Sequence, residues 1–151
     1  MINLDKYIYQ TNSSYLDYEF ESIGTKGIIK KVARFSSIGT NIYNFGFGDL
    51  NQVTGEIDDI TISNNGDGDK VLATVASIIY DFTGFYKDAA VYIKGSSAAK
   101  TRRYQMGINK YWEQINPVFE VFGSKNEKWE PFKTDENYEA FIGRRKAFFL
   151  F

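Results

Sequence analysis

The strongest constraint on the fold is the alternation of apolar and acidic residues near the start of the chain. In the stretch "YLDYEFESIG" (15–24), three apolar residues alternate with three acids: Leu16, Tyr18 and Phe20 with Asp17, Glu19 and Glu21. This period of two is typical of a half-buried antiparallel strand. Turn residues follow in "GTKG" and at Thr54-Gly55. We therefore expect an N-terminal meander of about four strands, at 15–24, 28–38, 41–50 and 57–63.

The pattern changes after the break "SNNGDGDK" (63–70). A wide apolar face predicts a helix over 69–87, and a second helix runs from about 97 to 116 and stops before Pro117. Short β-rich runs predict strands at 89–95 and 118–123. We read 124–141 as a loop with one helical turn near 135–141, and "KAFFLF" (146–151) as a buried strand or half of a homodimer contact. The expected fold class is α+β: an antiparallel β-sheet, with two main helices packed on it, in a single domain over 1–151.

Composition limits the chemistry open to this chain. Its 151 residues are 43% hydrophobic and 17% aromatic, enough for one packed core. It has no Cys and no His, which excludes Ser-His-Asp and Cys-His catalysis and His-ligated metal centres. We expect no cofactor and no metal. No apolar run approaches the roughly 20 residues that span a bilayer, and the pattern of the first residues leads us to expect no secretory signal. We expect a cytoplasmic protein without a membrane partner.

Two acidic regions are weaker candidates for a metal site. In "NNGDGDK" (64–70), Lys70 stands where an EF-hand loop requires Gly, and no Glu follows at the twelfth position. The simpler interpretation is a turn with Asp67 or Asp69 as the N-cap of the following helix. The carboxylates around the predicted hairpin are open to Mg²⁺ but are more typical of solvated acids: Asp49, Glu56, Asp58 and Asp59.

The Gly-Ser turn at 95–97 is the strongest candidate site. Gly95 would let the backbone approach a ligand, and Ser96 or Ser97 is a natural N-cap. Free N–H groups and the helix dipole suit such a turn to an anion. The segment 94–110 also carries five cations and no acid. The candidate anion-binding residues are Gly95, Ser96, Ser97, Lys100, Arg102 and Arg103, with Lys70 from the start of the other helix. The alternative is a capped helix whose basic residues are only solvated.

Helical phasing divides these cations. At about 100° per residue, one side of the helix is apolar and predicts the core face. Lys100 and Arg102 then flank that face, about 160° apart. Arg103 falls near Lys110 on the solvent side. A shared site therefore requires the two helix starts to meet, so that Asp67, Lys70, Ser96 and Arg102 surround one cleft.

Two blocks of the chain resemble an uncharacterised bacterial domain family of about 150 residues, common in Bacteroidetes. The blocks are Asn-x-Gly-Asp before Lys-Val-Leu-x-Thr-Val, and Gly-Ser before Arg-Thr-x-x-Tyr, and the match covers nearly the whole chain. Lys100 stands where the family usually has Arg. The resemblance implies a domain of unknown function and assigns no activity. The residues at its motif positions are Asn64 or Asn65, Gly66, Asp67, Lys70, Thr74, Gly95, Ser96, Thr101, Arg102 and Tyr104.

These observations favour a domain that binds an anionic partner, a nucleic acid or a nucleotide, through the Gly-Ser turn and the basic helix start. Two alternatives stay open. One is a small toxin-like enzyme that acts on nucleic acid or nucleotides with Asp67 or Asp69 and Arg102. The other is a structural or protein-interaction module that uses "KAFFLF" or the loop around Trp129.

Overall fold

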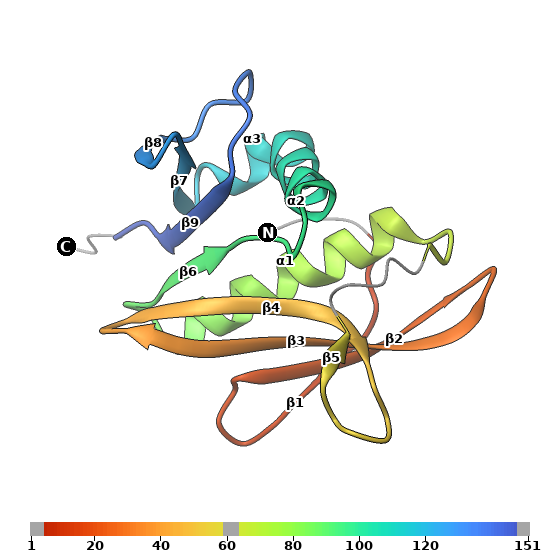
Figure 1. Ribbon diagram of the computed structural model, residues 1–151. Helices are drawn as coiled ribbons and strands as arrows, with labels where there is room; N and C mark the ends of the chain where they lie inside the picture. The colour runs from red at the N-terminus through yellow and green to blue at the C-terminus, as the bar shows by residue number, and fades with distance from the viewer. Residues whose placement is uncertain (1–4, 59–63, 148–151) are drawn as a thin grey trace.

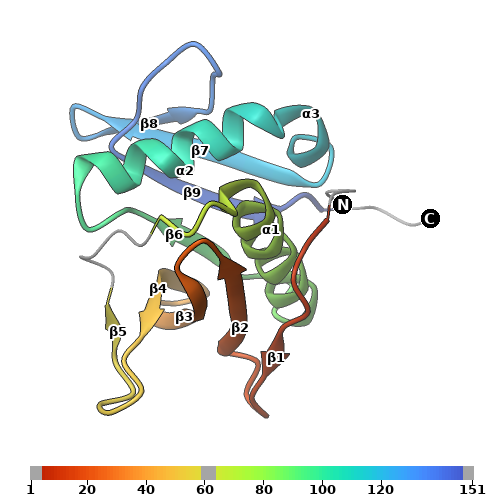
Figure 2. The ribbon, with the colours of Figure 1, turned by 90° about the vertical axis from the view of Figure 1, so that its right-hand side faces the viewer.

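A computed structural model describes residues 5–58 and 64–147 of the chain. It confirms an α+β fold, in which nine strands within these ranges form one mostly antiparallel sheet. Both main helices lie on the same face of that sheet (Figures 1 and 2). The elements are β1 (Gln10–Thr11), β2 (Asp17–Gly24), β3 (Gly27–Gly39), β4 (Ile42–Leu50), β5 (Ile57–Asp58), α1 (Gly68–Phe85), β6 (Ala90–Ile93), α2 (Ala98–Lys110), α3 (Trp112–Ile115), β7 (Phe119–Lys125), β8 (Lys128–Pro131) and β9 (Ala140–Arg145).

The N-terminal meander forms as the alternation predicts. β2, β3 and β4 pair antiparallel in sequence order, and Gly24 pairs with Gly27 across the turn of the β2–β3 hairpin. The apolar side chains of β2 face the helices because every second residue points to the same side. Tyr18 and Phe20 are buried there. Of the expected fourth strand, 57–63, only β5 lies within the described residues, where it pairs with β4.

One strand pair is parallel, which the sequence did not predict. The chain leaves β4, passes through α1 and returns as β6 beside β4 in the same direction. Parallel neighbours require a crossover of this kind, commonly a helix. Beyond β6 the sheet continues with β9, β7 and β8, and each of these strands pairs antiparallel with the one before it.

The C-terminal third differs from the prediction in three respects. β7 confirms the strand expected at 118–123, but β8, which pairs with it as a hairpin, lies in the segment read as a loop, and no helix occupies 135–141. The last described strand is β9, upstream of "KAFFLF". Lys146 and Ala147 belong to no strand, and 148–151 lie outside the described residues, so the expected C-terminal contact between two copies stays a prediction.

Aromatic residues dominate the core between α1 and the meander. Phe82 of α1 stacks on Phe35 of β3 with ring centres 3.8 Å apart. Val75 and Ile78 pack in the same cluster, as the apolar face of this helix predicts. A second apolar cluster packs α2 against β9 and against the segment that precedes β9. Its buried residues are Phe132, Tyr138 and Phe141. No helix among the described residues is long and apolar enough to cross a membrane.

Candidate anion-binding site

The Gly-Ser turn packs against the helix that follows it. Ser97 is the N-cap of α2, and its Oγ accepts a hydrogen bond from the backbone N–H of Lys100 at 3.2 Å. The Gly95 N–H donates to Thr101 Oγ1 at 3.0 Å. A Cβ on Gly95 would lie 2.5 Å from the Thr101 backbone nitrogen. The structure confirms the Ser97 cap, but it shows that the glycine makes room for α2 itself and that its N–H is already used.

One side of α2 borders a hollow of about 520 Å³, which we call the Arg102 hollow. Gln105 of α2 connects the helix to the segment before β9, which lines the hollow on its other side. The Gln105 amide group donates to the Glu136 carbonyl at 2.9 Å, and its oxygen accepts from the Tyr138 N–H at 3.1 Å. The hollow thus combines the Gly-Ser turn with the segment before β9. Its lining consists of Lys94, Gly95, Ser96, Ser97, Ala98, Thr101, Arg102, Gln105, Asn137, Tyr138 and Glu139.

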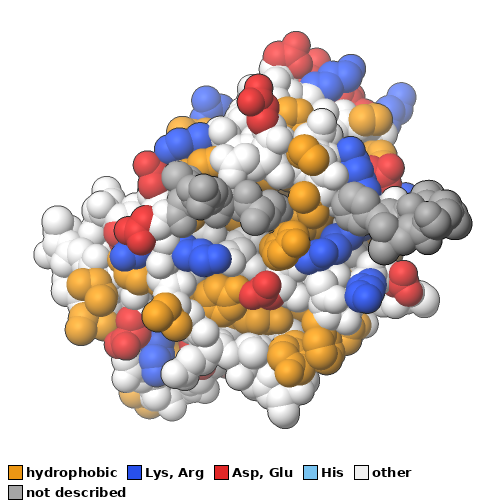
Figure 3. Space-filling view, turned by 180° about the vertical axis from the view of Figure 1, so that it is seen from behind, with side chains coloured by type: hydrophobic (Ala, Val, Ile, Leu, Met, Phe, Trp, Pro, Cys, Tyr) orange, Lys and Arg blue, Asp and Glu red, His pale blue; other side chains and the backbone are white. Residues whose placement is uncertain are grey.

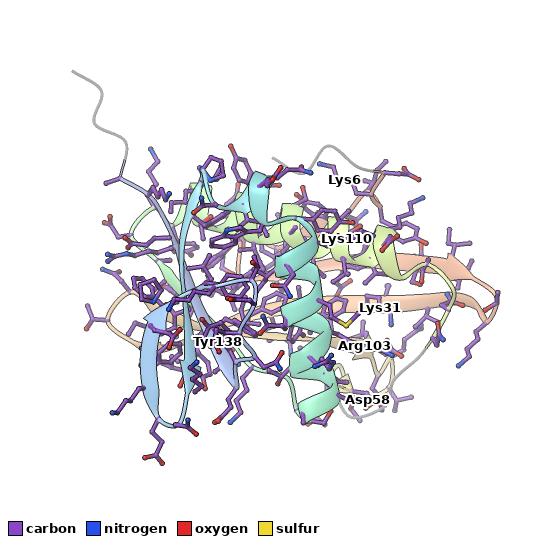
Figure 4. All side chains as sticks on the ribbon, turned by 90° about the horizontal axis from the view of Figure 1, so that it is seen from above. Lys6, Lys31, Asp58, Arg103, Lys110 and Tyr138 are labelled. Atoms are coloured by element: carbon purple, nitrogen blue, oxygen red, sulfur yellow. The ribbon has the colours of Figure 1, made fainter. Side chains whose placement is uncertain are left out.

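The other side of α2 borders the Arg103 hollow, of about 340 Å³. Figure 4 shows Arg103 and Tyr138 on opposite sides of α2. Lys100 is thus separated from Arg102, as helical phasing predicts. Arg103 is exposed on the side of α2 that also carries Lys110, as phasing predicts, and it shares its hollow with Lys100 (Figure 4). The lining consists of Phe47, Gly48, Asn64, Asn65, Asp67, Gly68, Val71, Leu72, Lys100, Arg103, Tyr104 and Met106.

Asp67 occupies the N-cap position of α1 without acting as a side-chain cap. Its carboxylate instead accepts hydrogen bonds from Tyr7 Oη at 2.7 Å and Ser22 Oγ at 2.5 Å. Burial raises the pKa of the Asp67 carboxyl, but the hydrogen bonds from Ser22 and Tyr7 outweigh it and hold that pKa below its ordinary value. Burial and the Asp67 contact raise the pKa of Tyr7. The N-cap position expected for Asp67 is thus confirmed, but its carboxylate makes no capping hydrogen bond and instead joins three distant segments.

Asn65 fastens the "NNGDG" turn to the β2–β3 hairpin. Its amide donates to Ser22 Oγ and to the Gly27 carbonyl, both at 3.0 Å, and its Oδ1 accepts from the Lys26 N–H at 2.6 Å. The side chain is buried, at 2% exposure. A Cβ on Gly24 would lie 1.8 Å from the Asn65 carbonyl oxygen, so only glycine fits in this hairpin. The turn is a structural joint between the hairpin and α1.

Two further predicted site residues, Lys70 and Asp69, have partners outside both hollows. Lys70 Nζ lies 3.6 Å from a carboxylate oxygen of Asp5 and 4.3 Å from the ring centre of Tyr7. Asp69 pairs with Lys110 at 2.9 Å. Neither residue lines the Arg102 or the Arg103 hollow. The structure brings Ser96 and Arg102 to one hollow and Asp67 to the other, so the single cleft that requires all four groups does not form.

Four cations surround the start of α2 without an ion pair among the described residues: Lys94, Lys100, Arg102 and Arg103. Elsewhere many cations are paired, as Arg34 is with Asp17 and Arg144 with Glu120. Figure 3 shows the rear face, where Lys and Arg side chains stand among Asp and Glu side chains. The start of α2 therefore carries positive charge that the described residues do not neutralise.

The acidic hairpin does not assemble a metal site among the described residues. Asp49 pairs with the buried Lys31 at 2.5 Å, and Asp59 lies outside the described residues. No group of three or more carboxylates that could hold a metal ion occurs within 5–58 and 64–147.

Sequence reasoning missed three residues that shape the site. Tyr7 and Ser22 hold Asp67, and Gln105 builds the wall of the Arg102 hollow. Gln105 lies on the buried side of α2, where a polar residue among apolar ones was the available signal. Tyr7 and Ser22 carried no such signal, because their partner lies 60 and 45 residues away.

Fold and site together define a small α+β domain with a basic helix start between two hollows. The chain belongs to the family of unknown function DUF6934, whose model matches residues 3–146. No curated protein and no solved structure matches it.

Proposed function

We propose that this domain binds nucleic acid across the N-terminal half of α2. The observation that carries the proposal is the group of four cations with no ion pair among the described residues, three of which, Lys94, Arg102 and Arg103, are exposed. Lys and Arg that neutralise phosphates supply most of the sequence-independent affinity for nucleic acid. A helix start adds N–H groups and a favourable dipole.

A strand with several phosphates fits this arrangement better than a single nucleotide. Arg102 and Arg103 border different hollows, on opposite sides of α2. A phosphate inside either hollow therefore meets a lining that includes only one of the two arginines. Successive phosphates along a strand that crosses α2 contact first one side and then the other. A mononucleotide would occupy only the Arg102 hollow, beside Ser97.

The enzyme alternative is less well supported, because the acid and the arginine that it requires do not lie together. It requires Asp67 or Asp69 beside Arg102, but Asp67 borders the Arg103 hollow and Asp69 pairs with Lys110. We retain a cytoplasmic location and a bacterial origin as parts of the proposal, since the composition and the motif blocks favour them.

Fluorescence anisotropy with labelled oligonucleotides tests the proposal. Arg102→Gln and Arg103→Gln should each weaken binding, because each removes one phosphate contact. Lys87→Gln is the matched control: Lys87 is exposed, has no ion pair among the described residues and precedes β6, whereas Lys94 follows it. Equal losses in all three variants, or none, would contradict the proposal. Displacement of the oligonucleotide by a mononucleotide at a similar concentration would favour the nucleotide instead.

A further inference from the structure

The Arg103 hollow, of about 340 Å³, has the size and the mixed lining of a small-molecule site. Binding pockets in proteins commonly have volumes of about 300–1,000 Å³, with apolar and aromatic walls and a few polar groups that orient the ligand. This hollow lies between β4, the start of α1 and one side of α2. Its apolar and aromatic side chains are Phe47, Val71, Leu72, Tyr104 and Met106.

The Asp67 carboxylate lines the same hollow and has one oxygen in reserve. The hydrogen bonds that it accepts from Tyr7 and Ser22 both end on Oδ2. Within the described ranges, Oδ1 accepts no hydrogen bond from another residue, and Asp67 forms no ion pair. Burial raises the pKa of this carboxyl, but its hydrogen bonds hold the pKa below the ordinary value, so the group is ionised at neutral pH. A carboxylate has about four acceptor positions, so Oδ1 has room for two further hydrogen bonds.

The charges around the hollow favour a ligand with N–H donors on one part and negative charge on another. Lys100 and Arg103 stand on the α2 side, and neither forms an ion pair among the described residues. The ionised Asp67 repels a phosphate inside the hollow, whereas it attracts N–H donors. One unit of a nucleic acid strand meets both conditions, because its base carries N–H donors and its phosphates remain for Lys100 and Arg103.

Guanine matches the two open acceptor positions of Oδ1 better than the other bases do. Its Watson–Crick edge has two adjacent donors, N1–H and the 2-amino group. Adenine and cytosine have an acceptor nitrogen next to their amino group, and the N3–H of thymine or uracil lies between two carbonyl oxygens. Those acceptors would face the carboxylate and be repelled by it. In a duplex this edge is paired with the other strand, so the base must be unpaired.

We propose that the Arg103 hollow holds one unpaired guanine of a single-stranded nucleic acid, whose N1–H and 2-amino group donate to Asp67 Oδ1. The apolar and aromatic side chains of the hollow pack against the base, and the neighbouring phosphates lie against Lys100 and Arg103. This inference rests on the proposed function, and it narrows the partner to a single strand.

Fluorescence anisotropy on the full chain, with labelled single strands, tests this inference. The strands are oligothymidine and the same strand with one central guanine, inosine or adenine. The guanine strand should bind at least about 10-fold more tightly than the oligothymidine or the adenine strand, because it donates hydrogen bonds to a charged group. Inosine lacks the 2-amino group and should give an intermediate affinity. Annealed to their complements, the guanine strand and oligothymidine should bind equally.

Asp67→Asn should reduce the guanine preference at least about 5-fold, because a neutral amide oxygen is a weaker acceptor than a carboxylate. The readout is the ratio of the guanine and oligothymidine affinities within each variant, so a general change in phosphate binding cancels. Asp69→Asn is the matched control: Asp69 pairs with Lys110 outside the hollow, and this variant should keep the full preference. The base series on the wild-type protein needs no variant, so it decides the inference even if Asp67→Asn impairs folding.

Equal affinity of the wild-type protein for all the strands overturns the inference, and so does a folded Asp67→Asn variant that keeps the full preference. Displacement of the guanine strand by guanosine monophosphate at a similar concentration also overturns it, because the hollow then takes a free nucleotide. Equal but salt-dependent binding of all the strands removes the inference and leaves the proposed function standing, whereas no binding to any strand removes both.

Discussion

Gly95 shows how closely the end of β6 packs against the first turn of α2. A methyl group there would lie 2.5 Å from the Thr101 nitrogen and 2.6 Å from Lys100 Cβ. We predict that Gly95→Ala lowers the free energy of unfolding by about 1–3 kcal/mol, since backbone must move to admit the methyl group. Gly68→Ala is the matched control, with no atom within 4 Å of the added Cβ. It should raise stability by about 0.5–1 kcal/mol. Urea denaturation measures both.

Asn65 contributes more than Asn64 to the stability of the contact between the β2–β3 hairpin and α1. Asn65→Ala removes three side-chain hydrogen bonds from a buried position. We expect a loss of roughly 2–4 kcal/mol in the free energy of unfolding. Asn64→Ala removes a single exposed contact of 3.4 Å to the Gly66 N–H and should change stability by less than about 0.5 kcal/mol. Similar losses in the two variants would contradict this assignment.

The pKa of Asp67 predicts how stability depends on pH. Its value in the folded state lies below the ordinary 3.8. The stabilisation from this carboxylate is thus fully present above the unfolded-state value and is lost as the pH falls through the folded-state value. Asp67→Asn should make the unfolding midpoint less sensitive to acid. Asp69→Asn, at an exposed ion pair, should leave the acid dependence close to that of the wild type. Denaturation curves at several pH values compare the two.

At the scale of secondary structure, the β7–β8 hairpin depends on an unusual turn. Asn126 and Glu127 both have positive φ, 52° and 62°. Two positive φ values in a two-residue loop are typical of the type I′ turn. Because the left-handed region is costly for a residue with a Cβ, Glu127→Gly should stabilise the protein by about 0.5–1 kcal/mol. The same change at Thr25, in the β2–β3 turn and without positive φ, should not stabilise. Thermal unfolding distinguishes the two results.

The elements that were predicted correctly have local signals. Alternation located β2, β3 and β4, and apolar periodicity located α1 and the buried side of α2. The β7–β8 turn has Asn-Glu in place of Asn-Gly, so the usual hairpin signal was absent. The parallel pairing of β4 with β6 depends on the path of the whole crossover, which no local pattern encodes.

The candidate site was predictable to a similar extent. Ser97 as N-cap and the separation of Lys100 from Arg102 follow from the order of residues in one helix. The true partners of Asp67, Lys70 and Asp69 come from other segments: Tyr7 with Ser22, Asp5 and Lys110. Because ion pairs form between distant segments, the local sequence does not show which cations are left without an acidic partner.

At the scale of the whole molecule, the net charge of −1 conceals an uneven distribution. Ion pairs neutralise many surface cations, whereas Lys94, Lys100, Arg102 and Arg103 have none among the described residues. This positive charge at the start of α2 is the feature on which the proposed binding of a polyanion depends.

The salt dependence of oligonucleotide affinity tests the central claim most directly. For a single-stranded oligonucleotide, each neutralised phosphate contributes about −0.7 to the slope of log K against log salt concentration. Four cations therefore predict a slope of about −2.8 for the wild-type protein. A variant with Gln at Lys94, Lys100, Arg102 and Arg103 should have a slope near zero. A wild-type slope near zero, or an equal slope in the variant, would contradict the claim that the start of α2 binds nucleic acid.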